Sequence, residues 1–334
     1  MAIHHFRIDI LLTNPPFYSS QASMLESASL KSRPPNSSCT GAPIEMITPG
    51  GEVAFVRQLI AESTRPANRA KIQWFSSMFG KLSSVSAVVE HLRAHNCMNY
   101  AVTEFVQGQK TRRWCVAWSW MGFRPPTSVA RGIPGLEKKI LPFPSDFDFA
   151  AVAGSAISTS TPHQAALPLD RVAAKINNAL DALDLLWQYK PAVHAGLGMS
   201  RLGDVWSRKA RRKRQTETKR KRDRQDQGGE DEEMRSGSSS DSDASSSGEK
   251  DHPEPALVFK ITLLAGVPVV LPQPRADVPT ASPNGRRRET ATNPSVSPVH
   301  DSVRVHIRWL QGHDSVLFES FCGWLRRKVE SSVA

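Results

Sequence analysis

The chain has 334 residues, 39% of them hydrophobic, which is enough for one large or two smaller domains. Its net charge of +11 is concentrated, because residues 208–224 hold eleven Lys or Arg against two acids. The rest of the chain is close to neutral, which excludes a protein that is basic over its whole surface.

Residues 7–120 alternate predicted strands and helices. Hydrophobic runs and helical spacing define these elements, and Gly50-Gly51 precede the first helix. In order, the predictions are a buried strand at 7–13, a long loop at 19–49, a helix at 52–63, a strand at 71–79, a helix at 83–95, and two β-rich runs at 99–107 and 112–120. The last two runs, separated by Gly108 and a polar turn, predict an antiparallel hairpin. This order predicts a mainly parallel sheet covered by helices, with one antiparallel strand added by the hairpin.

The second half of the chain differs from the first in composition and in the order of its predicted elements. Residues 225–255 are acidic, rich in Ser and almost free of apolar residues, which predicts disorder. The predicted elements are a strand near 146–152, an amphipathic helix at 169–189, a strand at 203–214, strands at 257–264 and 303–310, and a helix at 314–329. Together they predict a small α+β domain that is interrupted by two disordered inserts.

The cysteines are far apart and form no C-x-x-C pair, which argues against a zinc ribbon or a disulfide scaffold. They are Cys39, Cys97, Cys115 and Cys322. The N-terminus lacks the features of a signal peptide, and the apolar stretch at 256–272 is too short to cross a bilayer. We therefore expect a soluble intracellular protein with reduced thiols, no membrane association and no metal site.

The first strand ends in Asn14-Pro15-Pro16-Phe17. Ligands of open α/β sheets bind at the carboxyl ends of strands, where these residues are predicted to lie. An Asn amide and a proline carbonyl can both accept hydrogen bonds from an exocyclic amino group, and Phe17 can stack on a flat base. The prolines keep the loop stiff, so the four residues could orient an amino nitrogen toward an electrophile without a general base. The alternative is a strand end that simply turns through two prolines.

This stretch resembles the N-P-P-[FYW] motif of S-adenosylmethionine-dependent amino-group methyltransferases. Three further stretches, TGAPIEMITPGGEVAFVRQLIAES, WFSSMFGKLSSV and TEFVQGQKTRRWCVAWSW, are similar to the family of methyltransferase-like protein 16 and bacterial 23S rRNA adenine-N6 methyltransferase F. The resemblance covers roughly residues 7–121. It implies that Asn14, Pro15, Pro16 and Phe17 are the catalytic motif and that loop 19–49 lies on the substrate side. It also implies an RNA-facing role for the hairpin residues Gln107, Gly108, Arg112 and Arg113.

The resemblance further implies an α/β fold that corresponds to the C-terminal half of a class I (Rossmann-like) methyltransferase sheet. A glycine-rich cofactor loop is expected upstream of the catalytic strand in this family, and we find none before Arg7. We therefore expect an N-terminally truncated eukaryotic homologue, of fungal or another type, or one that has lost its enzymatic function. Gly196-x-Gly198 follows a predicted helix rather than a strand, so it is a weak candidate for the missing loop.

The basic block has three interpretations: a bipartite nuclear localisation signal over 208–222, RNA phosphate contact, or a solvated charged linker. The RNA-contact interpretation rests on Lys209, Arg211, Arg212, Lys213 and Arg214. The terminal stretch WLQGHDSVLFESFCGWLRRKV is similar to the C-terminal RNA-binding region of eukaryotic methyltransferase-like 16 proteins, which is related to kinase-associated domains. The alternative is an accessory domain with a packing role only.

The predicted organisation combines these segments. It comprises a partial catalytic domain at 1–124, a linker at 125–168, a kinase-associated-like RNA-binding domain at 169–214 and 256–330, and disordered inserts at 215–255 and 272–300. The predicted function is S-adenosylmethionine-dependent RNA adenine-N6 methylation, with a U6 small nuclear RNA hairpin as partner, in the nucleus or also the cytoplasm. The alternative is a non-catalytic RNA-binding remnant. The sequence determines neither the oligomeric state nor whether Met1 is the genuine start of the protein.

Overall fold

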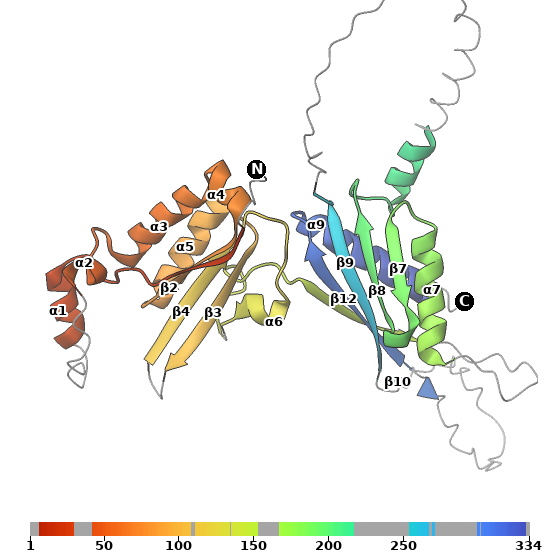
Figure 1. Cartoon of the computed structure of the whole chain (residues 1–334). Helices are drawn as coiled ribbons and strands as arrows, with labels where there is room; N and C mark the ends of the chain where they lie inside the picture. The colour runs from red at the N-terminus through yellow and green to blue at the C-terminus, as the bar shows by residue number, and fades with distance from the viewer. Residues whose placement is uncertain are drawn as a thin grey trace, which may run out of the picture.

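The computed structural model describes residues 7–29, 42–107, 111–133, 135–152, 167–216, 254–266, 269–270, 299–300 and 302–331. These residues form two five-stranded sheets, each with its own helices (Figure 1). The predicted disordered inserts lie almost entirely outside the described residues. No helix in the described part of the chain is long and apolar enough to span a membrane.

The first sheet has the strand order β1-β2-β4-β3-β5. Its strands are β1 (Ile8–Thr13), β2 (Ile72–Phe79), β3 (Tyr100–Gln107), β4 (Thr111–Trp118) and β5 (Arg131–Gly132). β1 runs parallel to β2, whereas β4 is antiparallel to both β2 and β3. The strand at 71–79 and the hairpin are thus confirmed, and so is the predicted α/β class.

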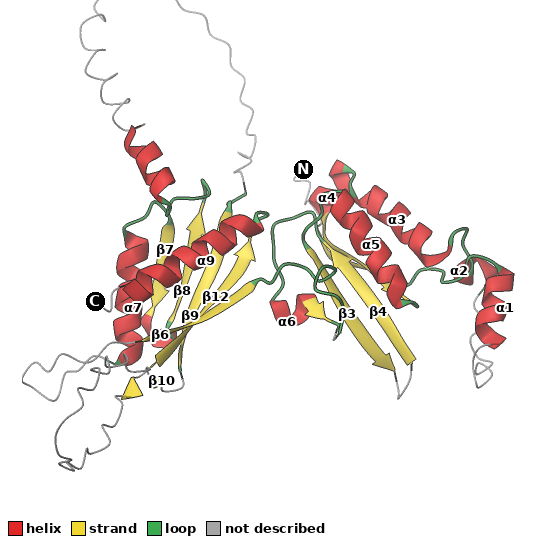
Figure 2. Ribbon diagram, turned by 180° about the vertical axis from the view of Figure 1, so that it is seen from behind, coloured by secondary structure: helices red, strands yellow, loops and turns green. Residues whose placement is uncertain are grey.

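Helices cover one face of this sheet (Figure 2). They are α3 (Gly51–Ser63), α4 (Pro66–Lys71) and α5 (Leu82–Ala94), accompanied by the shorter or peripheral helices α1 (Gln21–Ser29), α2 (Pro43–Met46) and α6 (Thr127–Ala130). The apolar stripe of α5 at Val85, Val88 and Leu92 is fully buried, as the i, i+3, i+7 spacing predicts. The prediction of a loop over 19–49 was wrong in part, because α1 and α2 lie within it.

The second sheet is antiparallel throughout, in the order β6-β12-β9-β8-β7. Its strands are β6 (Asp146–Val152), β7 (Leu186–Lys190), β8 (Ala195–Ser200), β9 (Leu257–Ala265) and β12 (Ser302–Gln311), and β10 (Val269–Val270) pairs separately with β11 (Val299–His300). Helices α7 (Pro168–Asp181) and α9 (Ser315–Glu330) lie on the same face of the sheet (Figure 2). Alternate residues of β9 and β12 point into this layer, as expected for a sheet with one covered face.

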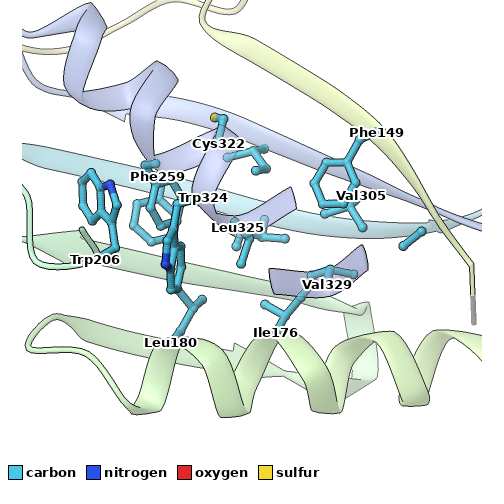
Figure 3. Packing of buried hydrophobic residues seen from close by; sticks show 14 of the residues in the cluster. Phe149, Ile176, Leu180, Trp206, Phe259, Val305, Cys322, Trp324, Leu325 and Val329 are labelled. Carbon is cyan, nitrogen blue, oxygen red and sulfur yellow. The ribbon is translucent and has the colours of Figure 1, made fainter. Parts of the chain in front are cut away.

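Aromatic side chains fill the core between this sheet and its helices (Figure 3). Phe259 of β9 lies 4.1 Å from Phe321 of α9, measured between ring centroids, and Trp206 lies 5.2 Å from the same ring. All three side chains are at most 1% exposed. The Asp314 carboxylate begins α9 by accepting hydrogen bonds from the Val316 and Leu317 amides.

Three predictions for the second half were wrong in part. The helix predicted at 169–189 ends at Asp181, and the last residues of the predicted range belong to β7, which is followed by a short 3₁₀ turn at Pro191–Val193. Within the strand predicted at 203–214, residues 208–214 are helical instead, and this helix continues to residue 216. The predicted linker contains the helix α6 and two strands, β5 of the first sheet and β6 of the second.

The two sheets are joined at Arg124. Its guanidinium donates hydrogen bonds to the carbonyls of Gly312, His313 and Met98, and it lies 4.1 Å from the ring centroid of Trp309. The Arg124 amide donates to the Leu310 carbonyl at 2.8 Å. Burial lowers the pKa of Arg124 to about 10, which leaves the side chain charged at neutral pH.

Candidate active site

The Asn14-Pro15-Pro16-Phe17 segment lies directly after the carboxyl end of β1, as predicted. Pro15 is buried, Pro16 and Phe17 are half-buried, and Asn14 is exposed. The chain then pairs with the segment before α3, because the Tyr18 amide donates to Met46 and the Tyr18 carbonyl accepts from Thr48. The motif is therefore held at both ends, while the Asn14 amide faces solvent.

The first strand is less buried than predicted. Ile10 is 52% and Leu12 76% exposed, and β1 pairs only with β2 among the described residues. Leu11 faces the helix layer and packs against the core. An apolar strand with an unpaired edge leaves backbone hydrogen-bonding groups available to a further strand.

A shallow pocket of about 130 Å³ borders the Phe17 ring. Small-molecule sites usually measure roughly 300–1,000 Å³, so this pocket is smaller than a usual small-molecule site. Its walls come from the segment after Phe17, the first turn of α3 and the start of α5. They include Ser19, Gly51, Glu52, Lys81 and Ser84.

The hairpin arginines have different partners. The Arg113 guanidinium carbon lies 5.7 Å from the Phe17 ring centroid, a cation–π distance, so the structure brings these two predicted residues together. Arg112 instead forms an ion pair with Glu104 at 2.6 Å. The Gln107 backbone pairs with Thr111, but its side chain and Gly108 lie outside the described residues.

Each sheet with its helices is called a unit below. The other predicted RNA contacts belong to the second unit, away from the motif (Figure 1). Lys209, Arg211, Arg212, Lys213 and Arg214 are on the exposed helix 208–216. Ser207 begins this helix by accepting a hydrogen bond from the Ala210 amide, and Arg214 pairs with Asp184 at 2.6 Å. The structure thus separates two cationic regions, one beside Phe17 and one on this helix.

Gly196-x-Gly198 does not form a turn that could hold S-adenosylmethionine. Gly196 and Gly198, the weak candidate for a cofactor loop, lie inside β8 rather than in a turn between a strand and a helix. A Cβ atom at Gly196 would overlap the Trp187 ring, and one at Gly198 would overlap Phe259. These glycines make room for core aromatic rings, so that candidate was wrong.

Sequence reasoning missed the environment of Glu52, which it placed only at a helix start. Glu52 is 4% exposed, and its Oε2 atom accepts a hydrogen bond from the Gly80 amide at 2.7 Å. The Gly-Gly-Glu sequence before an amphipathic helix was the available signal. Its partner lies 28 residues away, however, and only the fold brings the two together.

The cysteines in the described part of the chain show no sign of catalytic activation. Burial raises the pKa of Cys97 to about 12 and that of Cys115 to about 11, so both thiols stay protonated at neutral pH. Cys97, Cys115 and Cys322 are not in disulfides. Among the described residues, no group of three or more His, Cys, Asp or Glu side chains could hold a metal ion.

Comparison with known proteins gives a consistent result. A sequence profile of an RNA methyltransferase family matches residues 2–122. The chain is 36% identical over 202 residues to a U6 small nuclear RNA (adenine-(43)-N(6))-methyltransferase of Schizosaccharomyces pombe, which covers 60% of this chain and 46% of that protein. It is 33% identical over 214 residues to RNA N(6)-adenosine-methyltransferase mettl16 of Danio rerio, covering 61% and 43%.

The chain thus spans less than half the length of these two relatives. Among solved structures, the catalytic domain of human Mettl16 in complex with a MAT2A 3′UTR hairpin is 35% identical. The match covers 35% of this chain and 41% of that one, with a TM-score of 0.31.

Proposed function

We propose that the chain belongs, through residues 2–122, to this RNA methyltransferase family and that it acts in the N6-methylation of adenine in RNA. The proposed substrate is a U6 small nuclear RNA hairpin, and S-adenosylmethionine is the proposed methyl donor. The observation that carries the proposal is the placement of Asn14-Pro15-Pro16-Phe17 at the carboxyl end of β1, with Phe17 beside Arg113.

Each residue of the motif has a task in this proposal. The exposed Asn14 carbonyl accepts one hydrogen of the adenine amino group, and a proline backbone carbonyl accepts the other. Phe17 stacks on the adenine, which must leave its helix stack to reach the site. These contacts turn the nitrogen lone pair outward and hold it in place, which favours reaction by orientation. The amino proton leaves after the nitrogen has been methylated.

Two cationic regions would bind the RNA backbone. Arg113 lies close enough to Phe17 to contact the phosphates that flank the target adenine. The basic helix 208–216 would contact phosphates farther along the hairpin, and binding should therefore weaken as salt rises. The same block supports a nuclear location through the bipartite-like signal at 208–222, or a location shared with the cytoplasm.

S-adenosylmethionine would supply the methyl group to the amino nitrogen that Asn14 and a proline carbonyl hold. The test is transfer of a radioactive methyl group from S-adenosylmethionine to a U6 hairpin by the 334-residue chain. The proposal predicts incorporation that falls at least about 100-fold in Asn14→Ala, because the amino group is no longer oriented. Asn178→Ala, an exposed Asn on α7, is the matched control and should retain full activity.

A second candidate function is RNA binding without catalysis. It is favoured by the position of Gly196 and Gly198 inside β8, which leaves the described residues without a glycine-rich turn for the cofactor. Calorimetry with S-adenosylmethionine separates the two candidates. Measurable binding supports the enzyme, whereas hairpin binding without cofactor binding or methyl transfer supports the second candidate.

A further inference from the structure

Glu52 is a buried carboxylate beside the motif, with few of the partners that such a group usually has. Charged side chains are almost never fully buried unless they are paired. Glu52 is 4% exposed, yet its Oε1 atom has no hydrogen-bond partner among the described residues. Its Oε2 atom accepts a single hydrogen bond, from the Gly80 amide. Acidic side chains are favoured in the first turn of a helix, but an exposed carboxylate gives the same stabilisation. The position of Glu52 at the start of α3 therefore does not explain its burial.

Gly80 connects Glu52 to Phe17. It follows β2 and lies so close to the aromatic ring that an added Cβ atom would be 3.3 Å from Phe17 Cδ1 and 3.4 Å from Glu52 Oε2. The Phe17 ring therefore rests on the backbone of Gly80. The hydrogen bond from the Gly80 amide to Glu52 fixes that backbone relative to α3.

The first turn of α3 also approaches the motif directly. A Cβ atom at Gly51 would be 3.5 Å from the Phe17 carbonyl oxygen. Phe17 is thus contacted at its backbone by the α3 turn and at its ring by Gly80. A residue that must stack on a base needs such support, because a small displacement of a positioned group strongly lowers activity.

We propose that Glu52 is a positioning residue: by holding the Gly80 amide, it keeps the Phe17 ring in the orientation that stacks on the target adenine. The inference rests on the proposed function, since it assigns Glu52 to the same site. Glu52 does not touch the RNA in this account and acts only through Gly80. A carbonyl oxygen at the same place would serve equally well as the acceptor.

The test is the selectivity of RNA binding for the target base. Fluorescence anisotropy measures the Kd of a U6 hairpin that carries adenosine at the target position, and of the same hairpin with an abasic residue there. Stacking of one base on an aromatic ring should make the adenosine hairpin bind at least about fivefold more tightly to the wild-type chain. The ratio of the two Kd values, abasic over adenosine, measures this preference for the base. We expect the ratio to fall to about one in Phe17→Ala and Glu52→Ala. It should stay at the wild-type value in Glu52→Gln, which keeps a hydrogen-bond acceptor.

Two further variants separate positioning from general damage. Glu62→Ala removes another acid of α3, one that is partly exposed and paired with Arg65, and should leave the ratio unchanged. Gly80→Ala leaves Glu52 intact but places a methyl group against Phe17, and should lower the ratio even if Glu52→Ala does not fold.

The possible results distinguish the inference from the proposed function. A wild-type ratio above about five that persists in a folded Glu52→Ala variant, or in Gly80→Ala, overturns the inference alone. A wild-type ratio of one shows that the motif does not recognise a base and overturns the proposed function together with the inference. Loss of the ratio in both variants, with retention in Glu52→Gln and Glu62→Ala, supports the positioning role.

Discussion

In the second sheet, β12 and β9 lie between neighbouring strands, and their inward residues are buried under α7 and α9. In the first sheet, β1 pairs only with β2 within the described part of the chain, and its Leu12 is 76% exposed, although its sequence is as apolar as that of a central strand. The unit with the more complete core thus carries the basic helix, and the unit with the uncovered edge carries the motif. A buried core stabilises a fold, whereas an apolar edge beside a candidate site remains open to further polypeptide.

The largest effect should come from the aromatic core of the second sheet. Phe321→Ala removes a ring that contacts Phe259 and Trp206 and has no exposed surface. We expect the free energy of unfolding of this unit to fall by about 3–5 kcal/mol, because the change leaves a cavity. Urea unfolding followed by tryptophan fluorescence measures it. A loss below about 1 kcal/mol would show that this core is not close-packed.

Removal of the junction arginine should have the next largest effect. Arg124→Ala deletes hydrogen bonds from a charged donor to three carbonyls and the contact with Trp309. We expect a loss of roughly 2–3 kcal/mol and separate unfolding transitions for the two units, measured by calorimetric melting. Arg65→Ala, at an exposed ion pair, is the control and should change little. A single unshifted transition in Arg124→Ala would contradict the role of Arg124 in joining the units.

A smaller effect is expected at the start of α9. Asp314→Ala removes the acceptor for the Val316 and Leu317 amides and should cost about 1 kcal/mol of the second unit's unfolding free energy. Asp314→Asn keeps an acceptor at this position and should be nearly neutral. Equal losses in the two variants would show that charge, rather than capping geometry, begins this helix.

The smallest effect is expected at the exposed edge. Leu12→Ala should change the unfolding free energy by less than about 0.5 kcal/mol, because most of the Leu12 side chain is already in water. The matched change Leu11→Ala, on the core-facing side of β1, should cost more. Urea unfolding compares the two variants. A cost above 1.5 kcal/mol for Leu12→Ala would show that another part of the chain covers β1.

Local sequence patterns predicted much of the fold. Helical spacing placed α5, and β-rich runs placed the hairpin of β3 and β4 and the strand β12. The strand β7 was missed because its helical-looking sequence is overridden by pairing with β8, where Gly196 leaves room for Trp187. The helix at 208–216 was missed although Arg and Lys are good helix formers and Ser207 is a good cap.

The candidate site, like the fold, could be predicted only in part from the sequence. Asn14 to Phe17 could be proposed as a site from sequence, because the proposed chemistry depends on four adjacent residues and on the strand before them, and the structure confirms that strand. The contacts of Phe17 with Gly80 and Arg113 could not, because they join segments that only the sheet brings together. The burial of Glu52 also depends on this tertiary approach, and no local pattern encodes it.

Recognition of the adenine amino group by Asn14 is the central claim, and one binding measurement tests it without a cofactor. Fluorescence anisotropy compares a U6 hairpin that carries adenosine at the target position with the same hairpin carrying purine riboside, which lacks the amino group. We expect the wild-type chain to bind the adenosine hairpin about threefold to tenfold more tightly and Asn14→Ala to bind both hairpins alike. Equal binding of the two hairpins by the wild-type chain, or a preference that survives Asn14→Ala, would contradict it.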